Sequence, residues 1–270
     1  MSSEPDEGYE EIERRLERMM EEEHAKRAKR FKDEEYYKVR QLVFDTRTIR
    51  ALIKLFNKGV IRDITWIVSA GKEAVVMAGT GPEGDVAVKV YKIATANFRK
   101  YLDYIVGDYR FVPVRDRDRL IRLWAKKEYR NLLRLYEAGV SVPKPIAVVG
   151  NVLVMQFIGD EGFPAPLLKE VRELPDPSST LDAILADVRK TYLDAELVHG
   201  DLSEYNIMYW RERHWVIDVS QAVVTLHPMA EAYLRRDVER VIRFFSTRFG
   251  VRGPDPWRFV DELIREGEAR

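Results

Sequence analysis

The chain has 270 residues, of which 46% are hydrophobic and 33% are charged, so it can bury one substantial core or two small lobes and is not wholly disordered. Lys plus Arg equal Asp plus Glu at 45 each, which indicates no particular class of partner, and the absence of cysteine excludes disulfides, thiolate metal sites and cysteine nucleophiles. No segment approaches the roughly 20 apolar residues of a membrane span, and the charged start lacks a secretory apolar segment, so we expect a cytoplasmic protein without a membrane partner.

Residues 1–45 are predicted to form a charged N-terminal extension. Apolar residues recur there at helix-like spacing among balanced Glu and Arg residues, namely Ile12, Leu16, Met19 and Met20. This pattern predicts a solvated helical arm rather than a specific binding element. Basic residues at positions 26, 27, 29 and 30 could contact RNA, but a solvated helix face explains them more simply.

A helix is predicted over residues 48–59, where the apolar residues share one face and Gly59 supplies a stop. From residue 64 to residue 91 the signal changes to the short β-branched runs ITWIVS, AVVMAG and DVAVKVY. Gly and Pro between these runs predict antiparallel hairpins and a small sheet.

The next segment, around Asn97, Gly107 and Pro113, is polar and poorly periodic, and we predict a long loop. An amphipathic helix is predicted over residues 118–137, followed by a second hairpin formed by PIAVVG and NVLVMQFIG. Beyond it, the segment GDEGFPAP is predicted to be a connector because its Gly and Pro residues oppose regular structure.

The remainder is predicted to be mostly helical. One helix, capped by Ser179 or Thr180, runs to about residue 195, and two more span roughly 230–249 and 255–266. A polar loop and the short strands IMYW and WVID lie between them.

The order of these elements predicts an α+β fold with two lobes. An N-lobe at residues 46–158 holds the antiparallel sheet, one long helix and the helix that precedes the sheet, and a helical C-lobe occupies residues 159–270. Two lobes that meet at a cleft would suit a bound ligand.

The sharpest chemical signal is the segment LVHGDLSEYNIM, followed by WVID. Asp201 and Asn206 have the Asp-x-x-x-x-Asn spacing of a kinase catalytic loop, and Asp218 follows at a strand end. Phosphoryl transfer needs a carboxylate near the acceptor hydroxyl and oxygen ligands for Mg²⁺. We therefore predict that Asp201 orients or deprotonates the acceptor, and that Asn206 and Asp218 hold magnesium. The alternative is that Asp201 and Asn206 merely form turn hydrogen bonds; His199 is expected to brace the loop rather than to transfer protons.

Lys89 lies inside the strand VAVKV, where three valines point to one face and Ala87 and Lys89 to the other. A buried ammonium group needs an anionic partner. Glu128 lies on an otherwise apolar stripe of the long helix, and in kinases such a pair places the lysine against the nucleotide phosphates. The alternative is that Lys89 extends to the sheet edge and that Glu128 is unrelated to it.

Two further segments suit a nucleotide. The turn SAGKEA, with Ser69 and Lys72, could present backbone N–H groups to phosphate, although an ordinary hairpin turn is the alternative. A P-loop is excluded because its glycine spacing and its Lys-Ser/Thr pair are missing. In VLVMQFIG the backbone groups of Gln156 and Ile158 would contact the adenine edge, although a plain core strand is the alternative.

Together these motifs resemble the RIO family of atypical serine/threonine protein kinases, and its type 1 branch in particular. SAGKEA resembles the S-T-G-K-E-A signature of that branch and EYRNL resembles its long-helix motif. HGDLSEYNIM, VIDVSQAV and HPMAEAYLRRDV follow in the family order, so that the resemblance covers roughly residues 42–250. The type 2 branch carries an N-terminal winged helix, whereas here only a charge-rich segment of about 45 residues precedes the matching region, so we expect type 1.

The resemblance implies a trimmed two-lobed kinase fold without the usual activation segment and substrate-binding helices. It also implies ATP and Mg²⁺, or Mn²⁺ in its place, as cofactors, serine kinase activity with autophosphorylation, and a role in maturing the small ribosomal subunit with its precursor particle as partner. In this family the metal aspartate, here Asp218, is thought able to accept phosphate, which implies ATP hydrolysis. The site residues that the resemblance implies are Lys89, Glu128, Gln156, Ile158, Asp201, Asn206 and Asp218, with Ser69 and Lys72 in the phosphate loop.

The chain departs from ordinary kinases at several positions. The phosphate loop has a single glycine, Gly200 replaces the arginine of the catalytic loop, and Val219-Ser220 replace Phe-Gly after the metal aspartate. We therefore do not expect regulation by an activation-loop phosphate.

Two other functions stay open. A small-molecule kinase resembling aminoglycoside phosphotransferases would also use an H-G-D loop followed by asparagine, but SAGKEA and HPMAEAYLRRDV argue against it. A scaffold that binds preribosomes and uses ATP as a structural ligand is the second alternative, and the retained Lys89, Asp201 and Asp218 argue against a wholly inactive site.

Overall fold

The computed structural model describes residues 14, 17–18, 45–92 and 98–270. Most of the predicted extension at 1–45, with its basic residues at positions 26–30, and Asn97 therefore lie outside the described residues. The chain divides into two compact units that are interleaved along the sequence. Unit 1 comprises Met1–Asn97, Val114–Lys126 and Pro145–Pro164, and unit 2 comprises Phe98–Pro113, Lys127–Lys144 and Ala165–Arg270. The division into 1–45, 46–158 and 159–270 stays a prediction.

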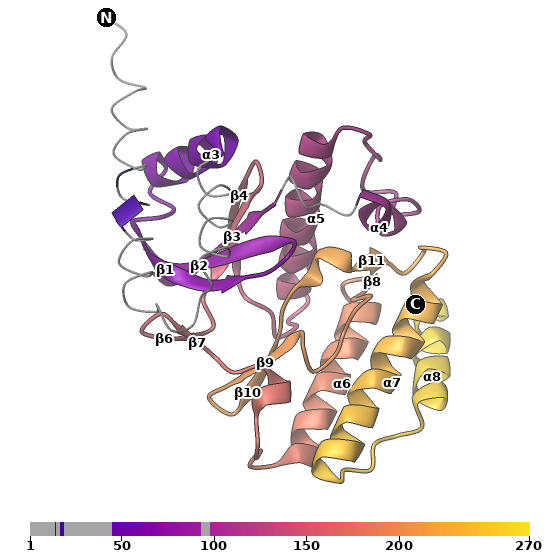
Figure 1. The fold of residues 1–270 in the computed structure, drawn as a ribbon. Coiled ribbons are helices and arrows are strands. Elements are labelled where there is room, and N and C mark those ends of the chain that lie inside the picture. The colour runs from indigo at the N-terminus through magenta and orange to yellow at the C-terminus, as the bar shows by residue number, and fades with distance from the viewer. Residues whose placement is uncertain (1–13, 15–16, 19–44, 93–97) are drawn as a thin grey trace, which may run out of the picture. The chain divides into compact units, whose positions relative to one another are not determined.

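In the described part of unit 1, an antiparallel sheet of five strands has the order β1-β2-β3-β5-β4 (Figure 1). The strands are β1 (Asp63–Ala70), β2 (Ala74–Gly81), β3 (Gly84–Tyr91), β4 (Pro145–Val149) and β5 (Val152–Gln156). Both predicted hairpins are confirmed, and pairing of β3 with β5 joins them into one sheet.

The two faces of this sheet differ in character. One face packs on helix α3 (Thr46–Asn57), which begins two residues earlier than predicted because Asp45 caps it with a hydrogen bond from the Arg47 amide. The core on this side includes Ala51, Leu52 and Leu55 of α3 and Val86, Val88 and Val90 of β3. The opposite face carries a smaller cluster of Ala78, Ala87 and Phe157, with the partly buried Trp66, Val68, Val76 and Met155.

The long amphipathic helix is α5 (Arg117–Glu137), which contributes residues to both units. The long loop predicted before it was partly wrong, since a short helix, α4 (Phe98–Asp103), occupies part of it. Six residues are too few to leave a repeating apolar pattern in the sequence.

Unit 2 is mainly helical, and its three main helices lie side by side (Figure 1). They are α6 (Pro177–Leu193), α7 (Ala230–Phe249) and α8 (Pro256–Glu268). The prediction that Ser179 or Thr180 caps α6 was wrong. Asp176 is the capping residue, its side chain accepts a hydrogen bond of 2.9 Å from the Ser179 amide, and Pro177 occupies the first turn.

Short elements complete unit 2. Strand β9 (Ile207–Trp210) pairs with β10 (Arg213–Val216), and β8 (Leu197–Val198) pairs with β11 (Val223–Val224). The one-turn helices are η1 (Leu168–Glu170) and η2 (Val219–Gln221). The sequence predicted β9 and β10, although β10 lies two residues earlier than WVID, whereas a two-residue strand such as β8 or β11 has no detectable alternation.

The predicted connector contains a minimal hairpin in unit 1, formed by β6 (Gly159–Asp160) and β7 (Phe163–Pro164). Trp66 fixes this hairpin, because its indole N–H donates to the Gly162 carbonyl at 2.8 Å and its ring meets Phe163 edge-on with centroids 4.7 Å apart. Gly162 takes a φ of +77°, which favours glycine. The expectation of wholly irregular structure was therefore wrong at this hairpin.

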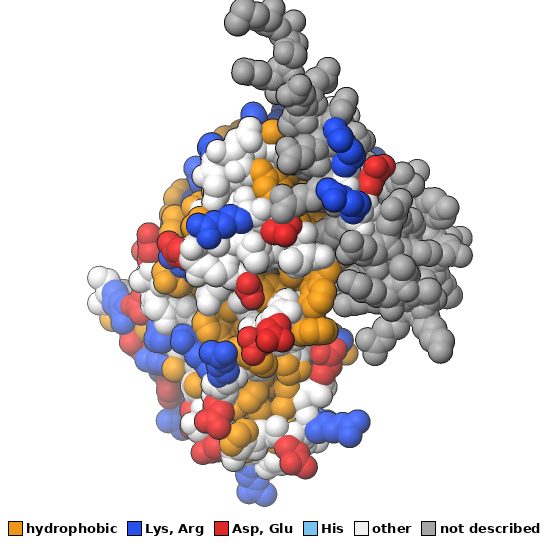
Figure 2. All heavy atoms as spheres, turned by 90° about the vertical axis from the view of Figure 1, so that its left-hand side faces the viewer, with side chains coloured by type: hydrophobic (Ala, Val, Ile, Leu, Met, Phe, Trp, Pro, Cys, Tyr) orange, Lys and Arg blue, Asp and Glu red, His pale blue; other side chains and the backbone are white. Residues whose placement is uncertain are grey.

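The surface carries both signs of charge. Figure 2 shows Lys/Arg and Asp/Glu side chains interspersed over the described part of one face, in keeping with the equal numbers in the sequence. Among the described residues, no helix combines the length and the apolar character needed to cross a membrane.

Candidate active site

The predicted catalytic loop follows β8 in unit 2, and helix α7 holds its backbone. Gly200 takes a φ of +79°, and its amide donates to Asp237 Oδ2 at 2.8 Å. Arg236 donates to the carbonyl of the same glycine. Both backbone groups of Gly200 are thus bonded by adjacent α7 side chains, which fixes the chain just before Asp201.

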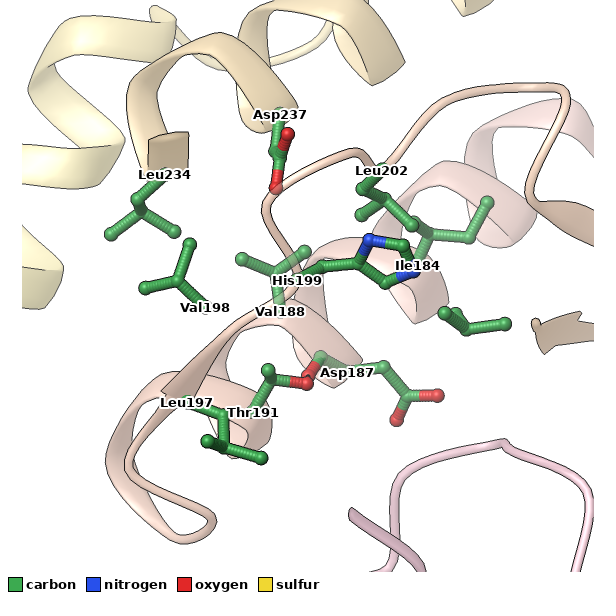
Figure 3. A pocket seen from close by; sticks show the side chains of 11 residues that line it. Ile184, Asp187, Val188, Thr191, Leu197, Val198, His199, Leu202, Leu234 and Asp237 are labelled. Carbon is green, nitrogen blue, oxygen red and sulfur yellow. The ribbon is translucent and has the colours of Figure 1, made fainter. Parts of the chain in front are cut away.

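Asp237 is nearly inaccessible, with 2% of its surface exposed. Burial raises the pKa of its carboxyl group to about 7, against the lowering effects of Arg236 and of the Gly200 and Leu202 amides. Asp237 and His199 line a mostly apolar cavity of about 20 Å³, enough for roughly one water molecule. Figure 3 shows both side chains among those that line it.

His199 braces the loop as the sequence predicts. Its Nε2 lies 3.2 Å from the Ile217 carbonyl, and its Nδ1 accepts a hydrogen bond of 3.2 Å from the Asp201 amide. These contacts require the neutral tautomer with the proton on Nε2. Burial lowers the pKa of His199, which favours this neutral form and a structural role.

The Asn206 side chain binds the backbone of Asp201 in this loop. Asn206 Nδ2 donates to the Asp201 carbonyl at 2.8 Å, so Oδ1 is the atom that Asn206 can offer to a metal ion. The Asp201 carboxylate accepts from Arg240 Nη1 at 3.0 Å and from Gln221 Nε2 at 3.4 Å. Its side chain is still 38% exposed, so an acceptor hydroxyl could reach it.

Asp218 lies two residues beyond β10 in a left-handed conformation, with φ 57° and ψ 60°. Its Oδ1 accepts a hydrogen bond from the Ser220 hydroxyl at 3.0 Å. The preceding Ile217 donates its amide to the Asn206 carbonyl at 2.9 Å, and its carbonyl contacts His199. The structure therefore brings Asp201, Asn206 and Asp218 into one hydrogen-bonded region of unit 2.

The chemistry of this region fits magnesium bound together with a nucleotide. Among the described residues, no group of three or more His, Cys, Asp or Glu side chains could hold a metal ion alone. Two carboxylates and one amide oxygen are hard ligands, and Mg²⁺ commonly uses one or two carboxylates together with phosphate oxygens and water. The donors present thus suit a metal ion that arrives with a triphosphate.

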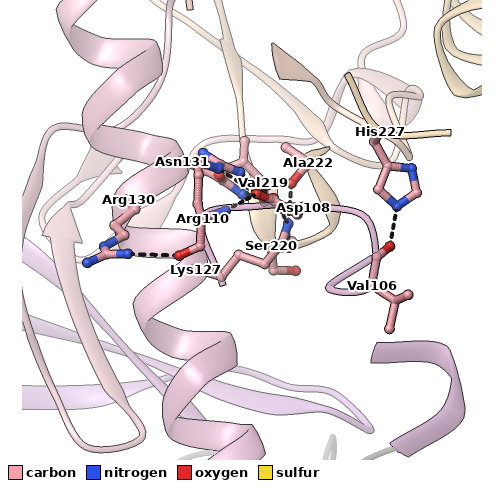
Figure 4. A network of polar contacts seen from close by, with 10 residues as sticks. All are labelled: Val106, Asp108, Arg110, Lys127, Arg130, Asn131, Val219, Ser220, Ala222 and His227. Atoms are coloured by element: carbon pink, nitrogen blue, oxygen red, sulfur yellow. Dashed lines mark hydrogen bonds and ion pairs between the residues drawn. The ribbon is translucent and has the colours of Figure 1, made fainter. Parts of the chain in front are cut away.

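The segment that follows Asp218 is held by the helix α5 (Figure 4). Lys127 donates to the Ser220 carbonyl at 3.2 Å and also to the Ala222 carbonyl. Asn131, one turn further along α5, donates to the Val219 carbonyl at 2.8 Å and to the Ala222 carbonyl at 3.1 Å. These bonds connect the long helix with the backbone beside the candidate metal ligand.

Lys127 is completely buried. Burial lowers the pKa of its ammonium group to about 7, with Arg110 adding to this effect and Asp108 opposing it. Asp108 Oδ2 lies 3.9 Å from Lys127 Nζ. The Asp108 carboxylate also forms a bidentate ion pair with Arg110, whose Nε lies 2.8 Å from Oδ1 and whose Nη2 lies 2.7 Å from Oδ2.

Unit 1 holds the other predicted nucleotide residues: Ser69, Lys72, Lys89, Gln156 and Ile158. Lys89 is 7% exposed and lies opposite Val76 of β2, which in turn lies opposite Ser69 of β1. Directly opposed residues share a face, so Ser69 and Lys89 lie on the side of the sheet that carries the small apolar cluster. Two small residues of this cluster, Ala78 and Ala87, lie on that side.

The remaining residues of this set lie at the ends of strands. Lys72 lies in the turn between β1 and β2, where the Gly71 amide donates to the Ala74 carbonyl at 2.9 Å. Gln156 is the last residue of β5 and pairs with Val86, and Ile158 follows two residues later. Glu128 is fully buried in unit 2, and its pairing with Lys89 stays a prediction.

Several residues with clear structural roles were missed by sequence reasoning. Arg236 and Asp237 belong to the motif HPMAEAYLRRDV, which by itself predicts no role for either residue. Asn131 lies in EYRNL and Lys127 directly precedes it, again without a predicted role. Their partners are mainly backbone atoms, which leave no mark on the spacing of side chains. A buried polar pair at i and i+4, as in Lys127 and Asn131, is the signal that could have been used.

Known proteins are similar in sequence to most of this chain. The RIO domain family matches residues 72–255. The RIO-type serine/threonine-protein kinase Rio1 of Haloferax volcanii is 44% identical over 218 residues, which cover 80% of this chain and 74% of the relative. The serine/threonine-protein kinase RIO1 of Caenorhabditis elegans is 38% identical over 224 residues, and there the match spans 82% of this chain but 44% of the relative's length.

A solved structure has a similar fold. The Rio2 kinase of Chaetomium thermophilum, in a complex described as ADP/Mg²⁺-phosphoaspartate, superimposes with a TM-score of 0.64 at 26% identity and covers 82% of this chain and 66% of that chain. The α+β kinase-like fold predicted from the sequence is thereby confirmed, with a sheet-rich unit 1 and a helical unit 2. This chain belongs to the RIO domain family of serine/threonine-protein kinases, with relatives named Rio1 that match its predicted type 1 branch.

Proposed function

We propose that this chain transfers the γ-phosphate of ATP to serine side chains, its own included, and that it hydrolyses ATP. The observation that carries the proposal is the hydrogen-bonded grouping of Asp201, Asn206 and Asp218 in unit 2. In this assignment Asn206 and Asp218 hold Mg²⁺, or Mn²⁺ in its place, and the ion neutralises charge on the phosphates. Asp201 orients the acceptor hydroxyl and takes its proton.

The apolar face of the unit 1 sheet is the proposed nucleotide surface. Ala87 and Val76 would contact the purine, and the backbone of Gln156 and Ile158 would meet its edge. Lys89 on the same face would bind the phosphates, with Glu128 as its partner and with Ser69 and Lys72 nearby on the sheet and its turn. The small side chains and the buried ammonium group of Lys89 support this assignment.

Hydrolysis would proceed through Asp218. One carboxylate oxygen attacks the γ-phosphorus, a new O–P bond forms, and the bond to the bridging oxygen breaks with its electron pair leaving on ADP. Water then attacks the acyl phosphate, which releases inorganic phosphate and restores the carboxylate. The phosphoaspartate in the description of the Chaetomium thermophilum Rio2 complex supports this route by analogy.

We also propose a cytoplasmic role in maturing the small ribosomal subunit, with the precursor particle as partner. This proposal rests on membership of the RIO family alone. The direct measurement is co-sedimentation with precursor particles. The protein should sediment with them in the presence of nucleotide and should dissociate when nucleotide is removed.

The enzymatic proposal is tested with purified protein, Mg²⁺ and γ-labelled ATP, after which free phosphate, acid-stable phosphoserine and acid-labile acyl phosphate are separated. Wild type should give free phosphate, phosphoserine and acid-labile acyl phosphate, and Asp218→Ala should give no acyl phosphate. Lys89→Met should weaken ATP binding as well as turnover, whereas Lys92→Met, at a partly exposed position just after the same strand, should match wild type.

Two other results would favour the alternative functions. ATP binding without any product would instead favour the scaffold. Phosphate found on an added aminoglycoside, with none on protein or in solution, would favour a small-molecule kinase.

A further inference from the structure

In the four residues after Asp218, backbone carbonyl groups are bonded by side chains from another element, the helix α5. Three of their carbonyl groups accept four hydrogen bonds from Lys127 and Asn131, as Figure 4 shows. The segment itself forms one short turn, η2, before it enters β11. Buried carbonyl groups need donors, and here side chains of α5 supply them.

The two donor residues are fully buried, at 0% exposure each. They stand four residues apart, so they share one face of α5. A buried ammonium and a buried amide are costly unless their hydrogen bonds are made. Such a pair is therefore better explained by a need to shape the bound segment than by simple packing.

A short path of contacts leads from this pair to the candidate metal ligand. Lys127 binds the Ser220 carbonyl, and the Ser220 hydroxyl binds Asp218 Oδ1 at 3.0 Å. The backbone of Asp218 has a left-handed conformation. This conformation costs a non-glycine residue about 1–3 kcal/mol and persists only where the surrounding structure fixes it. The α5 side chains supply part of that constraint.

We propose that Lys127 and Asn131 are positioning residues that hold the segment 219–222 and thereby aim the Asp218 carboxylate at the divalent metal ion. This inference rests on the proposed function, in which Asp218 binds that ion. Removing either donor should let the segment relax, and support groups of this kind commonly contribute 10- to 100-fold to metal affinity. Nucleotide binding by the sheet face should be affected much less.

The test compares Lys127→Met and Asn131→Leu with wild type. The matched control is Lys190→Met, since Lys190 also donates to a backbone carbonyl, that of Gly139, and to a carboxylate, that of Asp187, within unit 2. Mn²⁺ binding in the presence of ADP is measured by electron paramagnetic resonance, and amide hydrogen exchange is measured over residues 218–224. We expect about 10- to 100-fold weaker Mn²⁺ binding and faster exchange in both variants, and neither change in the control.

The outcomes distinguish failure of the positioning role from failure of the proposed function. Unchanged Mn²⁺ affinity and exchange in folded Asn131→Leu would overturn the inference while leaving the proposed function intact. If wild type with ADP binds no Mn²⁺, the proposed function fails, and with it the metal role of Asp218. Asn131→Leu removes no charge, so it carries the comparison if thermal unfolding shows that Lys127→Met does not fold.

Discussion

The two units hold their candidate site residues in different ways. In unit 1, Lys89 lies on a regular strand and Ser69 follows a register shift in β1, and their pairing with Val76 puts both on one face. In unit 2, Asp201 and Asp218 lie on irregular backbone, which includes left-handed residues and is bonded by side chains of α5 and α7. A regular strand supports its side chains through many equivalent hydrogen bonds, whereas the irregular loop depends on a few particular ones.

This contrast predicts where substitutions act. A change at a unit 1 site residue should remove its chemistry and leave the sheet in place. A change at a support residue of unit 2 should alter the shape of the site as well as the stability of the unit.

The largest expected effect comes from a change that leaves the loop intact and removes one charge. Asp201→Asn should reduce turnover by about 10²–10⁴-fold, because the amide cannot accept the hydroxyl proton. ADP affinity should change by less than about twofold, since the residue acts on the acceptor. Rapid-quench kinetics and calorimetry measure the two quantities, with the exposed Asp182→Asn as control. Turnover at the wild-type rate in Asp201→Asn would remove the proposed role of this residue.

The second prediction concerns the support of the loop. Asp237→Ala should lower the free energy of unfolding by about 1–3 kcal/mol, because the buried Gly200 amide loses its acceptor. Turnover of the folded fraction should fall as well, since the loop beside Asp201 is released. Asp176→Ala is the control: it removes the α6 cap, should cost roughly 1 kcal/mol, and should leave turnover unchanged. Equal activity of the two folded variants would mean that the loop keeps its shape without Asp237.

The third prediction uses pH. Lys127 has a pKa of about 7 in the folded chain and 10.5 as its ordinary value, so the unfolded chain binds more protons between these limits. The free energy of unfolding should therefore rise with pH above 7, by up to about 1.4 kcal/mol per pH unit from this group. The difference between wild type and Lys127→Met should grow accordingly in urea titrations from pH 7 to pH 9. A constant difference would mean that Lys127 keeps its proton.

The smallest effect on the candidate site is expected from a change at the connector hairpin of unit 1. Gly162→Ala should cost more than the roughly 1–2 kcal/mol of a left-handed alanine, because the new Cβ would lie 2.8 Å from the Trp66 ring. Gly59→Ala is matched to it, with a φ of +67° and no neighbour within 4 Å. The difference in melting temperature between the two variants measures the contact with Trp66, and turnover should stay at the wild-type level in both. A larger loss in Gly59→Ala would contradict this explanation.

The same contrast explains what the sequence could predict. Alternation in VAVKV located the faces of β3, and the spacing of Asp201, Asn206 and Asp218 located a single polar region, because both signals depend on positions along the chain. Asp237 binds backbone atoms of residues far from it in sequence, so its role depends on the folded backbone, which no spacing encodes. The strand pair β8–β11 was missed for a related reason, since two residues cannot show an alternation.

Gly200 has a consequence for which residues its position can accept. Its φ of +79° disfavours any side chain, a Cβ there would lie 3.0 Å from the Gln221 carbonyl oxygen, and both of its backbone groups are occupied by α7. The arginine that ordinary kinases carry at this position could not be accommodated without a change of the backbone conformation around it. The small residue at position 200 is thus part of the architecture of the loop, and an exchange there is expected to need compensating changes around it.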